Sequence, residues 1–484
     1  MLLGVGPATA QGTPDLTLTG VMTGADHETY REVGFRVPAG VTAITVEFAY
    51  TGREERSVID LGLRDPQRFR GWSGGNKSSF TVAGTWATAS YLPGPLPAGQ
   101  WKLILGVPNL RKDSRAPYTA KISFVRGPAF AGFAAAPLKT GLAWYRGDLH
   151  LHTGHSDGSC ASRKGVRVPC PLFKTVEAAA ARGLDFVSVT EHNATSHHQA
   201  LAELQPYYDD LLLIPGREIT TFHGHANVFG TTAPLDFQLG GPRAPSLERI
   251  LDQVAAAGGL ISINHPGMPS GEACMGCGWT AATDFSRIPA IEAVNGGSLA
   301  QTGGVDGFLS GIPFWEAGLN AGYRITAIGG SDNHDATRDP AQPQAVGVPT
   351  TVVRAAELSQ GAILAGIRAG HVFVDLAGAR DRTLQVTAAA GGQSAAMGDA
   401  LAAPAGARVM FAVHVAKAAG GRLALAGPAA RLVTLADAAL SADATSTFSL
   451  ISDGRPGWLR VDVRGPDGRL WLLGNPVYLN PPSH

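Results

Sequence analysis

Hydrophobic and polar positions alternate over short stretches in the first quarter of the chain. Runs rich in β-branched and aromatic residues, such as TAITVEFAY and YTAKISFV, are separated by turns rich in glycine and proline, such as VPAGV and LPGPLPAG. Short strands joined by such turns are typical of a β-sandwich. We therefore predict an N-terminal β-sandwich over residues 12–138.

The pattern changes near residue 139. Apolar runs such as DFVSVT, LLLIPG, GLISIN and RITAIGG alternate with helical segments such as KTVEAAAARG and SLERILDQVAAAGG. This alternation indicates βα units and a largely parallel sheet, either open or closed into a barrel, over residues 139–378. From about residue 380, strand-like runs such as RVMFAVHV and GWLRVDVRG return. They predict a second, smaller β-sandwich over residues 379–484.

Composition and charge exclude several classes of protein. Lys plus Arg and Asp plus Glu are equal, at 39 each, so no basic surface for nucleic acid is indicated. No apolar run reaches the roughly 18 residues of a membrane span. Residues 1–11 resemble the end of a signal peptide, with a small-residue Ala8-Thr9-Ala10 site, or are disordered. We predict a periplasmic or secreted protein, with the cytoplasm as the alternative, and leave the oligomeric state open.

Four cysteines fall in two close pairs in the sequence. An even number in an exported protein predicts disulfide bonds, for which three connectivities are possible. We predict the pairs Cys160–Cys170 and Cys274–Cys277, with cross-pairing between the two loops as the competitor. The CxxC motif is also half of a zinc site, but the chain has no second CxxC to complete one.

Side chains that commonly bind metals directly follow the apolar runs of the middle segment. The stretch RGDLHLHTGHSDGSC, residues 146–160, holds three of the chain's 14 histidines. Strand ends of a parallel sheet meet at one face, where such residues would gather. Mixed nitrogen and oxygen ligands favour zinc, manganese or iron over copper or calcium. The candidates are His150, His152, Glu191, His192, Glu218, His225, His265, Asp332 and His334.

Not every histidine of the middle segment fits this pattern. His197 and His198, in NATSHHQA, are predicted on a solvated surface. His223 and His225 form a second HxH motif, and we expect His223 to point away from the site that His225 enters.

The motifs DLHLHTGHSDG, VTEHN, GREIT, GHANVFG, NHP and GGSDNHD resemble those of the polymerase-and-histidinol-phosphatase (PHP) superfamily of metal-dependent hydrolases. The C-terminal stretch GWLRVDVRGPDGRLWLLGNPVYLN more loosely resembles the CehA/McbA branch, named for carbaryl hydrolases. The PHP resemblance implies a distorted (β/α)7 barrel with two or three divalent metal ions at its mouth. Zinc is the favoured metal, with manganese or iron as alternatives.

The resemblance also implies which residues hold each ion. The first ion would be bound by His150, His152, Glu218 and Asp332. Glu218 would bridge to a second ion, bound also by His225 and His265. A third ion would be bound by Asp157, His192 and His334. Family members usually have Asp at the position of Glu191, which we interpret as a residue that orients an imidazole.

A metal-bound hydroxide, supported by His150, His152, Glu218, His265 and Asp332, is the predicted nucleophile for a small-molecule substrate. Ser156 and Ser331 are interpreted as hydrogen-bond donors rather than as nucleophiles. Ester or carbamate hydrolysis is the first hypothesis, because apolar loop residues could line an aromatic pocket, although the alternative is that they belong to the core. These residues are Met268, Trp279, Phe308, Phe314 and Trp315.

Phosphoester hydrolysis is the alternative within the enzyme class. It would require a cation near the site, for which the candidates are Arg217 and the loop residues Arg163, Lys164 and Arg167. A hypothesis from another class is a carbohydrate- or surface-binding protein, in which the β-sandwiches bind and the metal site is structural.

Overall fold

The computed structural model describes residues 13–127, 132–134, 136–272, 274–433 and 439–481. The predicted signal-peptide remnant, residues 1–11, lies outside the described residues. Two compact units are present. The first comprises the described chain up to Ala136 with Thr195–Tyr207 and Thr231–Pro234, and the second comprises the remaining segments.

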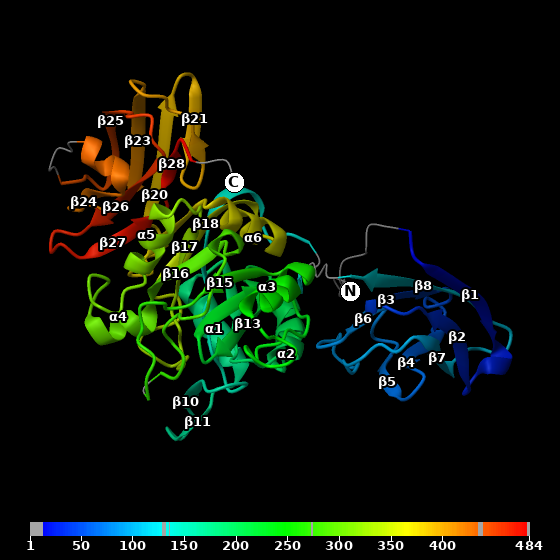
Figure 1. The fold of residues 1–484 in the computed structure, drawn as a ribbon. Coiled ribbons are helices and arrows are strands. Elements are labelled where there is room, and N and C mark those ends of the chain that lie inside the picture. Colours follow the sequence, from blue (N-terminus) through cyan, green and yellow to red (C-terminus); the bar gives the residue numbers. More distant parts are fainter. Residues whose placement is uncertain (1–12, 128–131, 135, 273, 434–438, 482–484) are drawn as a thin grey trace. The chain divides into compact units, whose positions relative to one another are not determined.

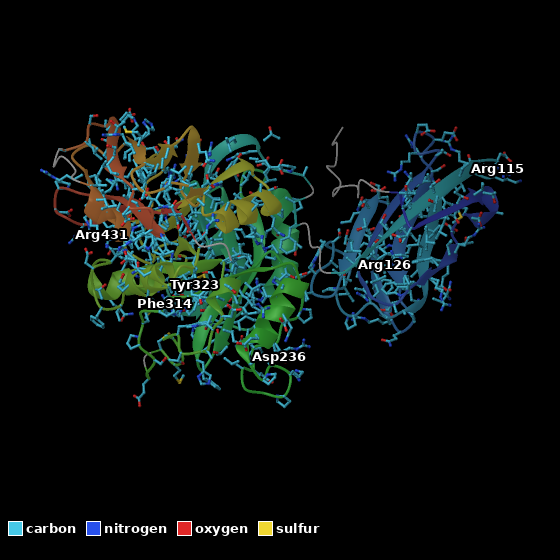
Figure 2. The ribbon with its side chains drawn as sticks, turned by 45° about the horizontal axis from the view of Figure 1, so that its top comes forward. Arg115, Arg126, Asp236, Phe314, Tyr323 and Arg431 are labelled. Carbon is cyan, nitrogen blue, oxygen red and sulfur yellow. A yellow bond between two sulfur atoms is a disulfide. The ribbon has the colours of Figure 1, made fainter. Side chains whose placement is uncertain are left out.

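The first unit is a β-sandwich. Two four-stranded antiparallel sheets enclose one core, which contains Ile44, Leu61, Phe80, Trp101 and Ile122. Figure 2 labels the two ends of β8, Arg115 and Arg126. One sheet consists of β1 (Leu16–Thr23), β8 (Arg115–Arg126), β3 (Val41–Tyr50) and β6 (Ser79–Ala83). The other consists of β2 (Tyr30–Val37), β7 (Gly99–Asn109), β4 (Val58–Arg64) and β5 (Phe69–Gly74).

The second unit is built on one long mixed sheet (Figure 1). Its first nine strands, in spatial order, are β17 (Thr326–Gly330), β16 (Ala290–Asn295), β15 (Leu260–Ile263), β14 (Gly224–Phe229), β13 (Leu212–Thr221), β12 (Phe186–Val189), β9 (Thr140–Asp148), β18 (Thr350–Glu357) and β19 (Val372–Asp375). The sheet continues through β27 (Leu470–Gly474), β26 (Gly457–Arg464), β28 (Val477–Leu479) and β22 (Ala400–Leu401), and β24 (Arg422–Ala426) also pairs with β26.

The arrangement is mixed α/β, and the distorted (β/α)7 barrel that the resemblance implied is not shown. Strands β9, β12 and β13 are parallel, as are β15, β16 and β17, but β14 is antiparallel to both of its neighbours. Only residues 222–223 separate β13 from β14. A parallel crossover needs about a dozen residues or more, so this connection can only be a hairpin.

Helices of the second unit bury one apolar face, as the sequence pattern predicted. Helix α3 (Leu247–Ala256) buries Leu247, Ile250, Leu251 and Val254, which is the spacing of one helical face. The other α-helices of this unit are α1 (Leu172–Arg182), α4 (Gly296–Thr302), α5 (Ile312–Asn320) and α6 (Gln360–Ala369). Short 3-10 turns are η1 (Gly24–Asp26), η2 (Gln205–Tyr207), η3 (Phe285–Arg287) and η4 (Pro428–Leu432).

Helix α2 (His197–Leu204) corrects one prediction. His197 and His198, expected on a solvated surface, are both buried. Their rings pack together with centroids 4.3 Å apart. The pair is therefore part of a packed interior rather than of a solvated face.

The carboxyl ends of β9 and β17 are joined by hydrogen bonds between the loops that follow them. The His152 amide donates to the Asn333 carbonyl (2.9 Å), and the Asp332 amide donates to the His150 carbonyl (2.9 Å). Asp148, fully buried, accepts from the amides of Ser331 (3.0 Å) and Gly347 (2.7 Å). Burial raises the pKa of Asp148 to about 6. These bonds bring two ligand-bearing loops side by side.

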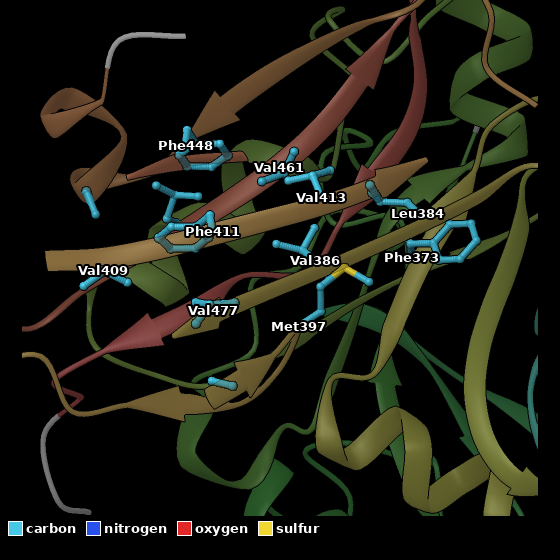
Figure 3. Packing of buried hydrophobic residues seen from close by; sticks show 14 of the residues in the cluster. Phe373, Leu384, Val386, Met397, Val409, Phe411, Val413, Phe448, Val461 and Val477 are labelled. Carbon is cyan, nitrogen blue, oxygen red and sulfur yellow. The ribbon is translucent and has the colours of Figure 1, made fainter. Parts of the chain in front are cut away.

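The C-terminal segment forms a second sandwich, which shares a layer with the rest of the unit. A sheet of β21 (Gln393–Ala396), β20 (Thr383–Ala390), β23 (Arg408–Ala416) and β25 (Asp443–Ile451) packs on the far end of the long sheet. Figure 3 shows the core between them, where Phe411 stacks on Phe448 at 5.0 Å beside Val386, Val461 and Val477. Residues 379–484 thus belong to the second unit. No helix within the described ranges is both long and apolar enough for a membrane span.

Asn475 connects strands of this shared layer by hydrogen bonds. Among such residues, it is the one whose substitution we expect to destabilise the second unit most. Its buried amide accepts from the Ala327 amide (2.8 Å) and donates to the carbonyls of Ala327 (3.0 Å) and Val372 (2.9 Å). Asn475→Ala leaves these backbone groups unpaired, and we expect the free energy of unfolding of the second unit to fall by roughly 3 kcal/mol. Exposed Asn320, which makes one bond to Trp458 (3.1 Å), is the control, with an expected loss below about 1 kcal/mol. Urea unfolding measures both losses, and equal losses would contradict the assignment.

Candidate metal centre

The structure brings all nine predicted metal ligands together at one end of the central sheet. Each stands on or just after a strand, or on the loop that follows it. His150, His152 and Asp157 follow β9, His192 follows β12, Glu218 lies in β13, His225 lies in β14, His265 follows β15, and Asp332 and His334 follow β17. This placement agrees with the expectation that strand ends gather polar side chains.

Glu218 is the centre of the group. It is fully buried, and its two carboxylate oxygens face five imidazoles. Oε1 lies 3.5 Å from His150 Nε2, 3.3 Å from His225 Nδ1 and 3.6 Å from His265 Nε2. Oε2 lies 3.5 Å from His152 Nε2 and 2.7 Å from His192 Nδ1. One carboxylate is therefore placed to be shared between more than one ion.

Asp332 and Asp157 extend the centre toward solvent. Asp332 Oδ1 lies 3.3 Å from His150 Nε2 and 3.2 Å from His152 Nε2. Asp157 lies 3.4 Å from His334 Nε2 and 3.6 Å from His192 Nε2. Asp157, His192 and His334 are partly exposed, whereas Glu218 and the other four histidines that face it are buried. The donors thus divide into an inner group and an outer group that opens to solvent.

The donor set fits divalent metal ions. Several buried nitrogen and oxygen atoms have no hydrogen-bond partner among the described residues, although buried polar atoms are nearly always paired. These atoms are His150 Nε2, both ring nitrogens of His152, Glu218 Oε2, His225 Nδ1 and His265 Nδ1. Among them, His150 Nε2, His152 Nε2 and His225 Nδ1 face the Glu218 carboxylate, as ligands of a common ion would. Nitrogen and oxygen donors in this mixture suit zinc, manganese or iron.

The carboxylates of the centre also need positive charge close to them. Burial would raise the pKa of Glu218, but His150 and His192 outweigh it and hold this pKa well below the ordinary value. Burial lowers the pKa of His334, but Asp157 and Asp332 outweigh it and raise it to about 9. His152 behaves differently, because burial dominates and lowers its pKa to about 4. The carboxylates remain ionised, and protons or metal ions must balance them.

Two ligands adopt backbone conformations that side chains other than glycine rarely take. His265 has φ of 28° and Asp332 has φ of 53°. Left-handed conformations of this kind cost about 1–3 kcal/mol and persist where the surroundings hold them. At these positions they turn the chain sharply at the end of a strand, so that the ligand side chain faces the centre.

Sequence reasoning missed two residues that hold the ligands in place. Glu292, buried in β16, lies 3.0 Å from His150 Nδ1 and accepts from the His265 amide (3.0 Å). Asn264 donates to Glu218 Oε1 (2.8 Å). The available signal for Glu292 was a single carboxylate within the apolar run AIEAVN. A carboxylate on the far nitrogen of a ligand histidine fixes its tautomer and orientation.

Glu191 does not contact an imidazole in the way we predicted. Its buried carboxylate accepts from the Thr153 amide (3.2 Å), the Thr153 hydroxyl and the Ser156 hydroxyl. It therefore holds the loop between His152 and Asp157. Its influence on the centre passes through the position of this loop.

Arg217 is not brought to the centre. Side chains of neighbouring residues in a strand point to opposite faces, and Glu218 occupies the inner one. The Arg217 guanidinium donates to the Leu235 carbonyl (2.7 Å) instead. Burial lowers the pKa of Arg217 to about 10, with Asp236 opposing the shift. Asp236, the residue after Leu235, is labelled in Figure 2.

The aromatic residues predicted for a substrate pocket are largely used for packing. Trp315 is fully buried, and its ring nitrogen donates to the Ile325 carbonyl (2.8 Å). Phe314, labelled in Figure 2, packs against Phe285 at 5.9 Å. The Trp279 ring packs on the backbone at Gly224, where any Cβ would lie 2.3 Å from it. Phe308, in contrast, is exposed.

Both predicted cysteine pairs are bonded in the structure. Cys160 and Cys170 join the hairpin of β10 (Ser159–Ala161) and β11 (Arg167–Pro169), with Cα atoms 4.9 Å apart. Cys274 and Cys277 are bonded within one loop, with Cα atoms 5.6 Å apart. The predicted connectivity is confirmed, and no cross-pairing occurs between the loops.

Comparisons with known proteins add a distant structural likeness. No protein-family model matches the chain, and no curated protein matches it. Among solved structures, a two-domain protein from Bacteroides vulgatus that contains a predicted PHP-like metal-dependent phosphoesterase is similar to it. The identity is 19%, the TM-score is 0.40, and the match covers 70% of this chain and 95% of that chain.

We predict at least two divalent transition-metal ions per chain, because the donors form overlapping groups around Glu218. Glu218→Ala removes the shared carboxylate, and we expect it to lose at least one of these ions. Glu177→Ala, at an exposed position of α1, should retain the full complement. Elemental analysis after reconstitution with Zn²⁺ or Mn²⁺ measures the content, and one ion or fewer in the unsubstituted protein would refute the prediction.

Glu292→Gln tests the residue behind His150. The substitution keeps the size of the side chain but removes the charge that orients the imidazole. We expect metal affinity to fall by about 10- to 100-fold while the number of ions at saturation stays the same. Competition with a chelator measures the affinity. An unchanged affinity would show that Glu292 has no influence on the ligand.

Proposed function

We propose that this chain is a divalent-metal-dependent hydrolase that uses water as its nucleophile and acts on phosphoesters. The observation that carries the proposal is the gathering of eight candidate ligands with nitrogen or oxygen donors around a ninth, the buried carboxylate of Glu218. The order of the motifs along the chain, which resembles PHP hydrolases, supports the same class. Divalent ions held by these residues would acidify a water molecule and polarise the scissile group.

The chain's own residues position the candidate metal ligands and exclude water from the inner ones. Glu292 holds the ring of His150, Asn264 holds Glu218, and Glu191 holds the loop that carries Asp157. The inner ligands are closed off from solvent, which strengthens electrostatic interactions between them and bound ions. Such an arrangement keeps its geometry through turnover instead of reorganising.

No serine at the site is arranged as a nucleophile. The Ser156 hydroxyl donates to Glu191, and the Ser331 hydroxyl donates to the His150 carbonyl (3.3 Å). Neither donates to an imidazole that could take its proton, in contrast to nucleophilic serines. We therefore propose direct attack by water without a covalent enzyme intermediate.

The charge of the site supports an anionic substrate. Three carboxylates among the ligands carry three negative charges, whereas two or three divalent ions carry four or six positive charges. The remaining positive charge attracts phosphate esters more strongly than neutral carbamates or esters. Arg163 and Lys164 add to this field. They are exposed on the β10–β11 hairpin, whose first residue donates to the His334 carbonyl (2.8 Å).

The two other hypotheses have less support in the described residues. Trp315 and Phe314, expected to line an aromatic pocket for ester or carbamate substrates, are packed against other side chains. A purely structural metal site is closed, whereas catalytic sites keep an open position. Asp157, His192 and His334 are partly exposed, and this opening favours a catalyst over a binding protein.

A substrate panel tests the proposal. We expect metal-dependent hydrolysis of p-nitrophenyl phosphate or bis(p-nitrophenyl) phosphate to exceed that of p-nitrophenyl acetate and of an N-methylcarbamate ester. His265→Ala, which removes a ligand beside Glu218, should abolish it. Preferred cleavage of the neutral esters would overturn the substrate class, and no metal-dependent turnover of any compound would overturn the enzyme assignment.

A further inference from the structure

The loop that follows β15 carries a buried sulfur to the edge of the metal centre. Cys277 is fully buried. Its Sγ and one ring nitrogen from each of His225 and His265 all lie within 4.8 Å of one another. A thiolate and two imidazoles at this separation can hold one Zn²⁺ or Co²⁺ ion. In the structure this sulfur is bonded to Cys274 instead.

The backbone around Cys277 is held against the strands that carry the metal ligands. Gly276 has φ of 78°, and a Cβ there would lie 2.2 Å from the Thr221 carbonyl at the end of β13. His225 Nε2 lies 3.3 Å from the Met275 carbonyl, and the Gly278 amide donates to the Ser270 hydroxyl (3.0 Å). These contacts do not depend on the disulfide bond. Cys277 therefore stays beside the two histidines when that bond is opened.

The two sulfurs of the pair differ in their access to solvent. Cys274 is partly exposed, and its neighbour Met275 is 75% exposed, whereas Cys277 is closed off. A thiol from solution can therefore reach the sulfur of Cys274 but not that of Cys277. Because the attacked sulfur keeps the new bond, Cys277 is the sulfur that is released.

We propose that in the reduced protein Cys277 joins His225 and His265 as a ligand of a divalent ion, and that the Cys274–Cys277 disulfide withdraws it. This inference rests on the metal centre of the proposed function and adds a sulfur ligand to it. The metal centre would then exist in two forms, one with nitrogen and oxygen ligands and one with a thiolate. The second form binds soft metal ions more tightly and carries one more negative charge.

The chemical step is a thiol–disulfide exchange with an external dithiol. One thiolate of the dithiol attacks Cys274 Sγ, the Cys274–Cys277 bond breaks, and Cys277 leaves as a thiolate that binds the ion. The second thiol of the dithiol, after losing its proton to solvent, then attacks the mixed disulfide. Cys274 leaves as a thiolate and takes up a proton from solvent. Two electrons pass to the protein disulfide, and the dithiol becomes a cyclic disulfide.

Cobalt is the probe, because a thiolate bound to Co²⁺ gives a charge-transfer absorption that imidazole and carboxylate ligands do not give. Cys274→Ser and Cys277→Ser are a matched pair, since each removes the disulfide and leaves one thiol. We expect Cys274→Ser loaded with Co²⁺ to show the near-ultraviolet band without any reductant, and Cys277→Ser to lack it. Cys277 in the first variant should also lose its reactivity toward iodoacetamide when Co²⁺ is bound.

The full chain provides a second measurement that needs no substitution. Reduced with a dithiol, desalted without oxygen and loaded with Co²⁺, it should gain the band and lose it on reoxidation. If elemental analysis finds equal cobalt in both variants and no band appears in Cys274→Ser or in the reduced chain, Cys277 is not a ligand and the metal centre stands. If neither variant nor the unsubstituted chain retains cobalt, the metal centre fails, and this inference fails with it.

Discussion

The arrangement of the second unit depends on the need to balance one buried negative charge. Glu218 lies in the middle of a sheet, away from water, where an uncompensated carboxylate would be prohibitively costly. Five imidazoles from β13's neighbours and from the loops at the strand ends face its two oxygens. Protons or metal ions on this shell complete the balance. The same requirement that stabilises the fold thus concentrates metal ligands at one point.

The departure from a regular (β/α) repeat has a direct consequence for this shell. In the β13–β14 hairpin, Glu218 pairs with Asn227 and Thr220 pairs with His225. Glu218 and His225 are therefore diagonal neighbours on one face, within reach of each other across the two strands. A helical crossover after β13 would have carried the next strand away. The tight turn delivers a ligand that a parallel strand in that place could not.

The centre is graded from a closed interior to an open rim. Glu218 and its inner histidines are held by buried residues such as Asn264 and Glu292, so their geometry is rigid. Asp157 and His334 stand on loops that water reaches, next to the cationic β10–β11 hairpin. On the other side, the loop with Cys274 and Cys277 covers His225. Buried, hydrogen-bonded candidate ligands thus lie beside candidate ligands that solvent reaches.

Local sequence pattern indicated the candidate ligands, the strand-rich ends of the chain and the two close cysteine pairs, with cross-pairing left open. His150, Glu218 and Asp332 follow or end apolar runs, and this can be read without knowing how the strands pair. What the sequence could not determine was which residues meet across the sheet. Glu292 and His150 are 142 positions apart, and only the pairing of distant strands brings them to 3.0 Å. For the same reason the sequence did not decide which way Arg217 points or whether Trp315 lines a pocket or belongs to the core. The face that a side chain occupies depends on strand register and packing, which are set by contacts between segments far apart in the chain.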